Sequence, residues 1–215
     1  MAEEEHTPIS GVPIWLVALV AVLFVAVLFT GAFVVSTIAG GDRYASPTER
    51  DIREASQTLA RDPDDLQARL ALAYAYQQGG RFEDAVREYD TVLNAVPDEP
   101  AALYNKGVAL LALGRETEGE EALWLTLAAR PAHVLAAKAL GVRLMEREEW
   151  TELAEMLLPV VEKDEKAADL QAMLGRAYEG LGDRQRALER YRLALVYDSD
   201  LSEALEGVER LEVTP

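Results

Sequence analysis

The pattern of hydrophobic and polar positions divides the chain into two parts near residue 40. Residues 14 to 35 read IWLVALVAVLFVAVLFTGAFVV, 22 residues without a charge, and no charged residue occurs between Glu5 and Asp42. A helix of this length extends roughly 33 Å, which matches a hydrocarbon core of about 30 Å. The pattern therefore predicts a transmembrane helix at 14–39, an acidic tail at 1–13 and a linker at 40–47.

Two alternatives for this segment follow from its flanking residues. A cleaved signal peptide ending near Ala39 is the weaker interpretation, because no Lys or Arg precedes the apolar core and the core exceeds the usual length. The arginines that follow the segment, at 43, 50 and 53, favour a cytoplasmic C-terminal domain by the positive-inside rule. Acidic residues are interleaved with these arginines, so an extracytoplasmic domain stays open as the alternative.

From residue 48 onward the apolar positions follow helical spacing with a fixed period of 34 residues. Pro63, Pro97 and Pro131 are separated by this step. The period defines four repeats, at 66–99, 100–133, 134–167 and 168–199. A half-repeat helix at 48–63 and a terminal helix at 200–212, acidic on its outer face, are predicted to cap the two ends.

Small and large residues recur at fixed places within each repeat. Place 8 reads Ala73, Gly107, Gly141 and Gly175, and place 20 is small in three of the four repeats, whereas places 7, 11 and 24 are mainly large and apolar. Small residues let two antiparallel helices approach closely, and the large residues fill the seam between them. Glycine suits the turn between the two helices at Gly80, Gly114 and Gly182.

This pattern resembles the tetratricopeptide repeat, most closely at 174–200, where the sequence reads LGRAYEGLGDRQRALERYRLALVYDSD. The resemblance covers about residues 48 to 212. It implies an all-α fold, a right-handed α-solenoid of antiparallel helix pairs, here preceded by one transmembrane helix. The third repeat departs from the pattern, because its turn lacks glycine and Pro159 lies inside its second helix. We expect a kink or an early helix end there, either as a tolerated irregularity or as a bend that shapes a binding surface.

The same resemblance implies a concave groove lined by the first helix of each repeat, at places 2, 5, 9 and 12. Leu70, Val108 and Val142 occupy such places, and packing between neighbouring first helices is an equal alternative for them. Leu135 occupies one as well. Aromatic and Met side chains in the middle of the groove suit an extended or helical peptide. The predicted partner-binding residues are Tyr74, Gln77, Tyr104, Asn105, Leu111, Lys138, Met145, Arg176 and Glu179.

A two-carboxylate clamp for chaperone tails is not supported by the residues at the corresponding places. That clamp needs Lys, Asn and Arg at five places, and this chain has Leu70, Tyr74, Asn105, Leu135 and Ala139 there. Only Asn105 matches.

Charge and composition exclude several classes of function. With 21 Lys and Arg against 38 Asp and Glu, the net charge of −17 disfavours nucleic-acid binding. There is no cysteine, and of the two histidines His133 is expected at the start of a helix. Paired carboxylates such as Glu120–Glu121 and Glu148–Glu149 are interpreted as solvated helix faces. We therefore expect no enzyme activity, no metal, no cofactor and no small-molecule substrate.

The sequence predicts a bacterial single-pass membrane protein that binds a protein or peptide segment in its groove and the lipid bilayer through 14–39. An assembly factor for envelope or membrane protein complexes is the role suggested by analogy of fold alone. A regulatory subunit of a membrane enzyme and a self-associating structural scaffold are the alternatives. The acidic terminal helix argues against the scaffold.

Overall fold

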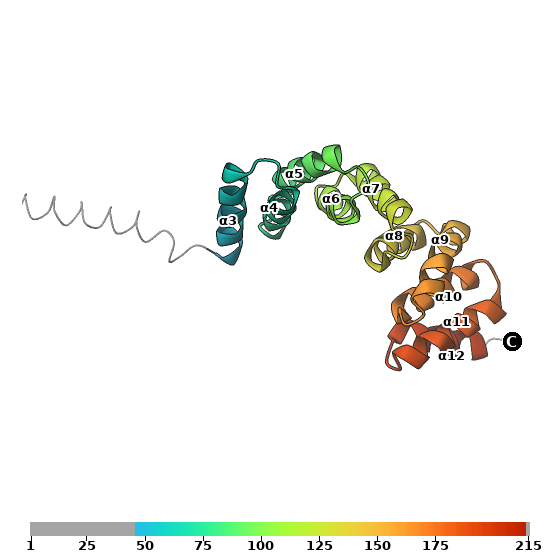
Figure 1. The fold of residues 1–215 in the computed structure, drawn as a ribbon. Coiled ribbons are helices and arrows are strands. Elements are labelled where there is room, and N and C mark those ends of the chain that lie inside the picture. Colours follow the sequence, from blue (N-terminus) through green and yellow to red (C-terminus); the bar gives the residue numbers. More distant parts are fainter. Residues whose placement is uncertain (1–45, 214–215) are drawn as a thin grey trace, which may run out of the picture. The chain divides into compact units, whose positions relative to one another are not determined.

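The computed structural model describes residues 46–213, which form ten α-helices and no strand (Figure 1). The chain divides into two compact units, 1–50 and 51–215, and almost all of the described helices belong to the second. The predicted acidic tail and transmembrane segment lie outside the described residues. No helix within the described range combines the length and hydropathy that a membrane span requires.

Eight helices form four consecutive pairs, and three-residue turns make the two helices of each pair antiparallel. The pairs are α4 (Leu66–Gln78) with α5 (Phe82–Ala95), α6 (Pro100–Ala112) with α7 (Glu116–Ala129), α8 (Val134–Glu146) with α9 (Trp150–Lys163), and α10 (Ala168–Gly180) with α11 (Arg184–Tyr197). Each pair begins at the first residue of one 34-residue window. The helix α3 (Pro47–Arg61) precedes the pairs, and α12 (Ser202–Val213) follows them.

Side-chain caps fix where several helices begin. Ser46 and Glu49 form a reciprocal capping box before α3, in which the Ser46 N–H donates to Glu49 Oε2 at 2.8 Å and the Glu49 N–H to Ser46 Oγ at 3.1 Å. The Asp65 carboxylate accepts from the Gln67 and Ala68 N–H groups in the first turn of α4, and the Asp183 carboxylate accepts from the Arg186 N–H in the first turn of α11. Pro100 opens α6, where a missing N–H costs nothing.

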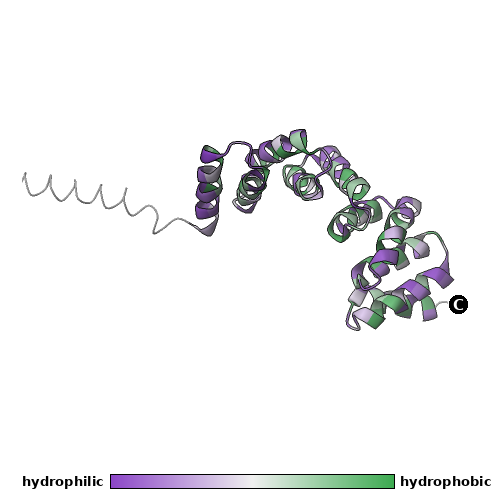
Figure 2. Ribbon diagram, in the orientation of Figure 1, coloured by the Kyte–Doolittle hydropathy of each residue, from purple (hydrophilic) through white to green (hydrophobic). Residues whose placement is uncertain are grey.

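The largest apolar core extends from α7 to α12, and smaller clusters lie between α4, α5 and α6. Several glycines lie where two helices approach closely. A Cβ added to Gly107 would lie 3.0 Å from the Gly119 carbonyl oxygen, and one added to Gly175 would lie 2.9 Å from the Tyr191 ring. In contrast, α3 is coloured mainly as hydrophilic in Figure 2 and buries only Ala55. Helix α3 therefore adds little to the core.

In the turn of the third repeat, which has no glycine, Glu148 adopts the left-handed backbone conformation. Gly80, Gly114 and Gly182 take the left-handed conformation in the other turns, with φ between 71° and 78°, and Glu148 takes it here with φ of 56°. Glutamate pays a steric penalty of about 1 kcal/mol for this conformation, which glycine avoids. The early helix end expected at Pro159 is wrong, because α9 continues to Lys163. Pro159 and Glu155 are both exposed, so water can reach the carbonyl that lacks an N–H donor.

The contact between Gly175 and Tyr191 makes a first testable prediction. Gly175→Ala places a methyl group against a ring that is fully buried and pressed from its other side by Gly207. Overpacking of this kind should lower the free energy of unfolding by about 1 to 3 kcal/mol, measured by urea titration with circular dichroism. Ala128→Leu, which adds bulk on the exposed surface of α7, should change it by less than about 0.5 kcal/mol. Equal stability of Gly175→Ala and the wild type would contradict the packing.

Candidate functional site

The candidate site is the inner face, defined as places 2, 5, 9 and 12 of α4, α6, α8 and α10. Three of its large apolar side chains are exposed: Tyr74 at 51%, Leu135 at 55% and Val142 at 42%. Leu135 and Val142 are two helical turns apart, so they share one side of α8, and the exposed Lys138 lies between them. This helix therefore presents an apolar strip with one cation to solvent. Packing between first helices, the alternative considered for Val142, does not cover it.

The predicted binding residues on α6 all make contacts within the chain. The ring centroid of Tyr104 lies 4.9 Å from that of His133, and burial raises the pKa of the Tyr104 hydroxyl. Asn105 donates its Nδ2 to the Ala101 carbonyl at 2.9 Å. Leu111 packs over Gly119, where an added Cβ would come within 2.8 Å of its side chain. Of these three, Tyr104 retains the most suitable chemistry for contact with a partner.

His133 starts α8, as the sequence predicts. Its Nδ1 accepts a hydrogen bond from the Ala136 N–H at 3.2 Å. Burial, reinforced by the charge of Arg130, lowers the pKa of the imidazole, so the neutral form that accepts this bond is favoured. The residue therefore serves the helix terminus and the contact with Tyr104.

The predicted residues on α8 and α10 lie at the junction of repeats 3 and 4. Lys138 Nζ pairs with Asp169 Oδ2 at 2.5 Å and so links the two first helices. Met145 is half-buried against the main core. The Arg176 guanidinium lies 5.9 Å from the centroid of the Trp150 ring and pairs with Glu179 at 3.3 Å. Polar groups at this end of the inner face thus have partners within the chain.

Sequence comparison identifies the repeating unit. Family profiles described as tetratricopeptide repeat match residues 70–134 and 168–200. These two segments consist of tetratricopeptide repeats. No curated protein matches the sequence significantly.

Solved structures show the same fold in other proteins. A crystal structure of MamA superposes with a TM-score of 0.60 at 21% identity, over 73% of this chain and 96% of that one. MamA from Desulfovibrio magneticus RS-1, residues 41 to the end, gives 0.59 at 22% identity, over 70% and 85%. YrrB, described as a TPR protein with an unusual peptide-binding site, gives 0.59 at 20% identity, over 75% and 84%. At these identities the likeness extends to the fold.

Repeats 1 and 4 each contain an equivalent hydrogen bond between their two helices, which the sequence analysis did not predict. The hydroxyl of Tyr89 donates to Gln77 at 2.9 Å, and that of Tyr191 donates to Glu179 at 2.8 Å. Both pairs join place 24 to place 12, and burial raises the pKa of both tyrosines. Gln77 and Glu179 were predicted as partner-binding residues. In the structure each also accepts a hydrogen bond that connects the two helices of its repeat.

Glu179 is the centre of a charged cluster at the last repeat. Arg210 of α12 donates to both of its carboxylate oxygens, at 2.7 and 2.8 Å. Hydrogen bonds from Arg210 and Tyr191, with the nearby charge of Arg176, lower the pKa of Glu179 to about 2. The carboxylate therefore fastens the C-terminal helix to the repeat before it.

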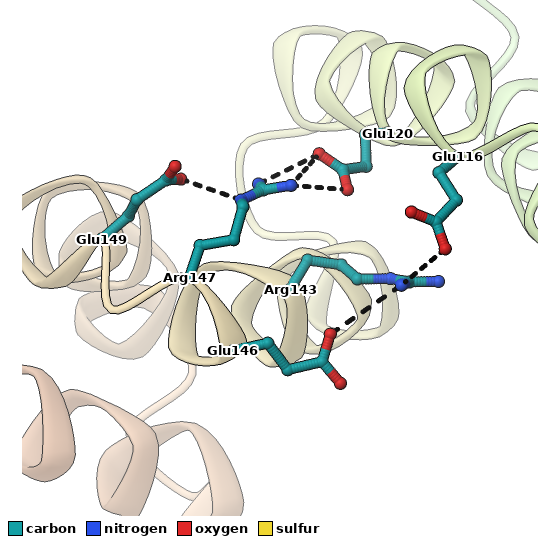
Figure 3. Close-up of polar contacts among 6 residues, drawn as sticks. All are labelled: Glu116, Glu120, Arg143, Glu146, Arg147 and Glu149. Atoms are coloured by element: carbon teal, nitrogen blue, oxygen red, sulfur yellow. Dashed lines mark hydrogen bonds and ion pairs between the residues drawn. The ribbon is translucent and has the colours of Figure 1, made fainter.

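A second network connects repeats 2 and 3 and corrects one interpretation of the sequence (Figure 3). The Arg147 guanidinium contacts both oxygens of Glu120 at 2.9 to 3.1 Å and also pairs with Glu149 at 3.2 Å. Arg143 also links the two repeats, through a single contact with Glu116 at 3.4 Å. Glu120 is therefore not part of a solvated face, since its side chain is only 15% exposed and bridges two repeats.

Within the described part of the chain, no group of three or more His, Cys, Asp or Glu residues could hold a metal ion.

Leu135 and Val142 stand at groove places but were not among the predicted binding residues. Place alone could not identify them, because exposure depends on how far the neighbouring first helices approach.

The low pKa of Glu179 predicts how the domain responds to acid. A carboxyl group whose pKa falls from 4.5 to about 2 on folding stabilises the fold above pH 4.5, and this stabilisation is lost as the pH falls towards 2. Glu179→Gln should therefore weaken the pH dependence of the unfolding free energy in this window, measured by urea titrations at several pH values. Glu189→Gln on the exposed surface of α11 is the matched control and should keep the wild-type dependence. An unchanged slope in Glu179→Gln would refute the assignment.

Proposed function

We propose that this chain is a membrane-anchored protein-interaction module whose inner face, centred on α8, binds a segment of another protein. The observation that carries the proposal is the exposure of Leu135 and Val142 on one side of that helix. Exposed apolar side chains that share a surface mark interaction sites, because burial against a partner removes them from water. The inner face of tetratricopeptide repeats is also where the family pattern locates the groove.

The arrangement of polar groups supports a peptide-like ligand. Lys138 lies between Leu135 and Val142, and its pair with Asp169 is exposed enough for a partner to compete for it. Tyr74 of α4 and Tyr104 of α6 add aromatic contact area, and Met145 and Arg176 lie on the later first helices α8 and α10. Apolar anchors flanked by a few charged groups fit an extended or helical segment. YrrB, the solved neighbour whose name states a peptide-binding site, is consistent with this class of ligand.

Membrane anchoring through 14–39 completes the proposal, with a role in assembling envelope or membrane protein complexes. A regulatory subunit of a membrane enzyme would use the same inner face and differs only in its partner. Self-association into a scaffold is less favourable, because α12 carries exposed acidic residues at Glu206, Glu209 and Glu212 and like charges repel between copies.

The inner face is tested by Leu135→Ala combined with Val142→Ala. Both side chains are exposed, so helicity should be preserved, while the loss of two apolar anchors should weaken partner binding by about 2 kcal/mol or more. Quantitative affinity purification from solubilised membranes compares the proteins that each variant retains. Leu125→Ala combined with Val196→Ala is the matched control, because these exposed residues lie on the second helices α7 and α11. Loss of the partner from the control and its retention by the α8 variant would place recognition on the opposite surface.

The anchor is tested by fractionation. Because residues 14–35 carry no charge, the full-length chain should remain in the membrane pellet after alkaline carbonate extraction. A variant lacking 1–41 should be released into the supernatant. Release of the full-length chain, or a mature N-terminus near Gly40, would contradict the anchor.

A further inference from the structure

Within residues 46–213, the first repeat has no preceding first helix beside it, whereas the later repeats do. The helices α6, α10 and α12 each contact both helices of the preceding pair. Among the described residues, α3 alone precedes α4 and corresponds to a second helix, and its backbone does not approach α4 as closely as the later neighbours approach one another. The surface of α4 that would meet a preceding first helix is therefore open.

A groove of about 480 Å³ occupies this position between α3 and α4. Its α4 wall contains Ala68, Ala71 and Ala75 with the half-exposed Tyr74, and Gln67 and Gln78 add two polar side chains. Short alanine side chains leave room that larger apolar side chains of a ligand can fill. The two walls are helices, so the geometry matches the packing of a third helix along them.

The register of the repeats shows which segment of this chain would correspond to the missing helix. A shift of α4 by one period falls on residues 32–44, which read AFVVSTIAGGDRY. This step rests on the proposed function, in which residues up to 39 form the membrane anchor, and Gly40 and Gly41 disfavour a helix in the remainder. The occupant of the groove is thus a helix from another molecule.

Charge defines the chemistry of that helix. The α3 wall contributes Asp51 and Glu54, and none of the described Lys or Arg residues lines the groove. Among the described residues these two carboxylates have no ion-pair partner, in contrast to Glu88 and Glu120 on later helices. A second copy of this chain is a poor ligand, because the exposed part of α12 is acidic. A helix with Lys or Arg along one flank is complementary.

We infer that the α3–α4 groove is a docking site for one amphipathic helix of a partner protein, with leucine-sized side chains against Ala68, Ala71 and Ala75 and basic residues beside Asp51 and Glu54. The inference goes beyond the proposed function, because the groove lies on a different pair of helices from the apolar strip of α8. The groove and that strip can bind different ligands.

The test uses the full-length chain in detergent micelles and two labelled helical peptides of the length of α4. One has leucine along one face with lysine on its flanks, and the other has glutamate in place of lysine. Fluorescence anisotropy measures binding, with empty micelles as background. The lysine peptide should bind saturably, at least tenfold more tightly than the glutamate peptide, and salt should weaken it.

Variants locate the binding. Ala71→Trp fills the groove from an exposed position and should weaken the lysine peptide at least tenfold. Asp51→Lys with Glu54→Lys should weaken it at least fivefold and improve binding of the glutamate peptide. Glu152→Lys with Glu155→Lys is the matched control, since these exposed residues have the same spacing near the start of α9, and it should stay within twofold of the wild type.

Three outcomes would overturn the inference: no saturable binding of the lysine peptide, unchanged binding by Ala71→Trp with wild-type helicity, or an equal loss in the α9 control. The Leu135→Ala and Val142→Ala double variant separates this site from the apolar strip of α8 and should bind the lysine peptide within twofold of the wild type. Loss of binding in that variant alone is a fourth contrary outcome, because it would place the ligand on the apolar strip of α8.

Discussion

The fold depends on the close approach of the two helices within each repeat, which only small side chains permit. Tyr191 shows the constraint most clearly, because its ring is fully buried between Gly175 and Gly207 and its hydroxyl donates to Glu179. One side chain thus joins both helices of the last repeat to the terminal helix. With the core formed in this way, the inner face is free to carry exposed apolar groups.

Much of the array could be predicted from the sequence, because period, turn glycines and small residues at fixed places are all local signals. Contacts between repeats could not. Arg147 and Glu120 are 27 residues apart, and nothing near either residue in the sequence indicates that they pair. The same holds for Glu148, whose left-handed conformation is imposed by the length of the turn although the residue disfavours it. The capping box at Ser46 and Glu49 also has a local signal, because Ser followed three residues later by Glu is the pattern of such a box.

For the candidate site, the sequence predicts which positions of the first helices face inward, but it does not predict which of those side chains are exposed. The places identify which helix side faces inward, but exposure is decided by the neighbours that pack there. Gln77 and Glu179 are used by tyrosines of their own repeats, Leu111 is held against Gly119, and Leu135 and Val142 are left in water. Polar groups on the inner face are thus mainly engaged within the chain, and apolar groups supply the surface that a partner can bury.

The central claim is that an anchored array presents α8 to another protein, and photo-crosslinking in intact membranes tests it most directly. A photoreactive phenylalanine analogue replaces Val142 in one variant and Glu155, an exposed residue of α9, in another. The account predicts a covalent adduct with a second protein from position 142 and none from position 155. Adducts formed only from position 155 would contradict it.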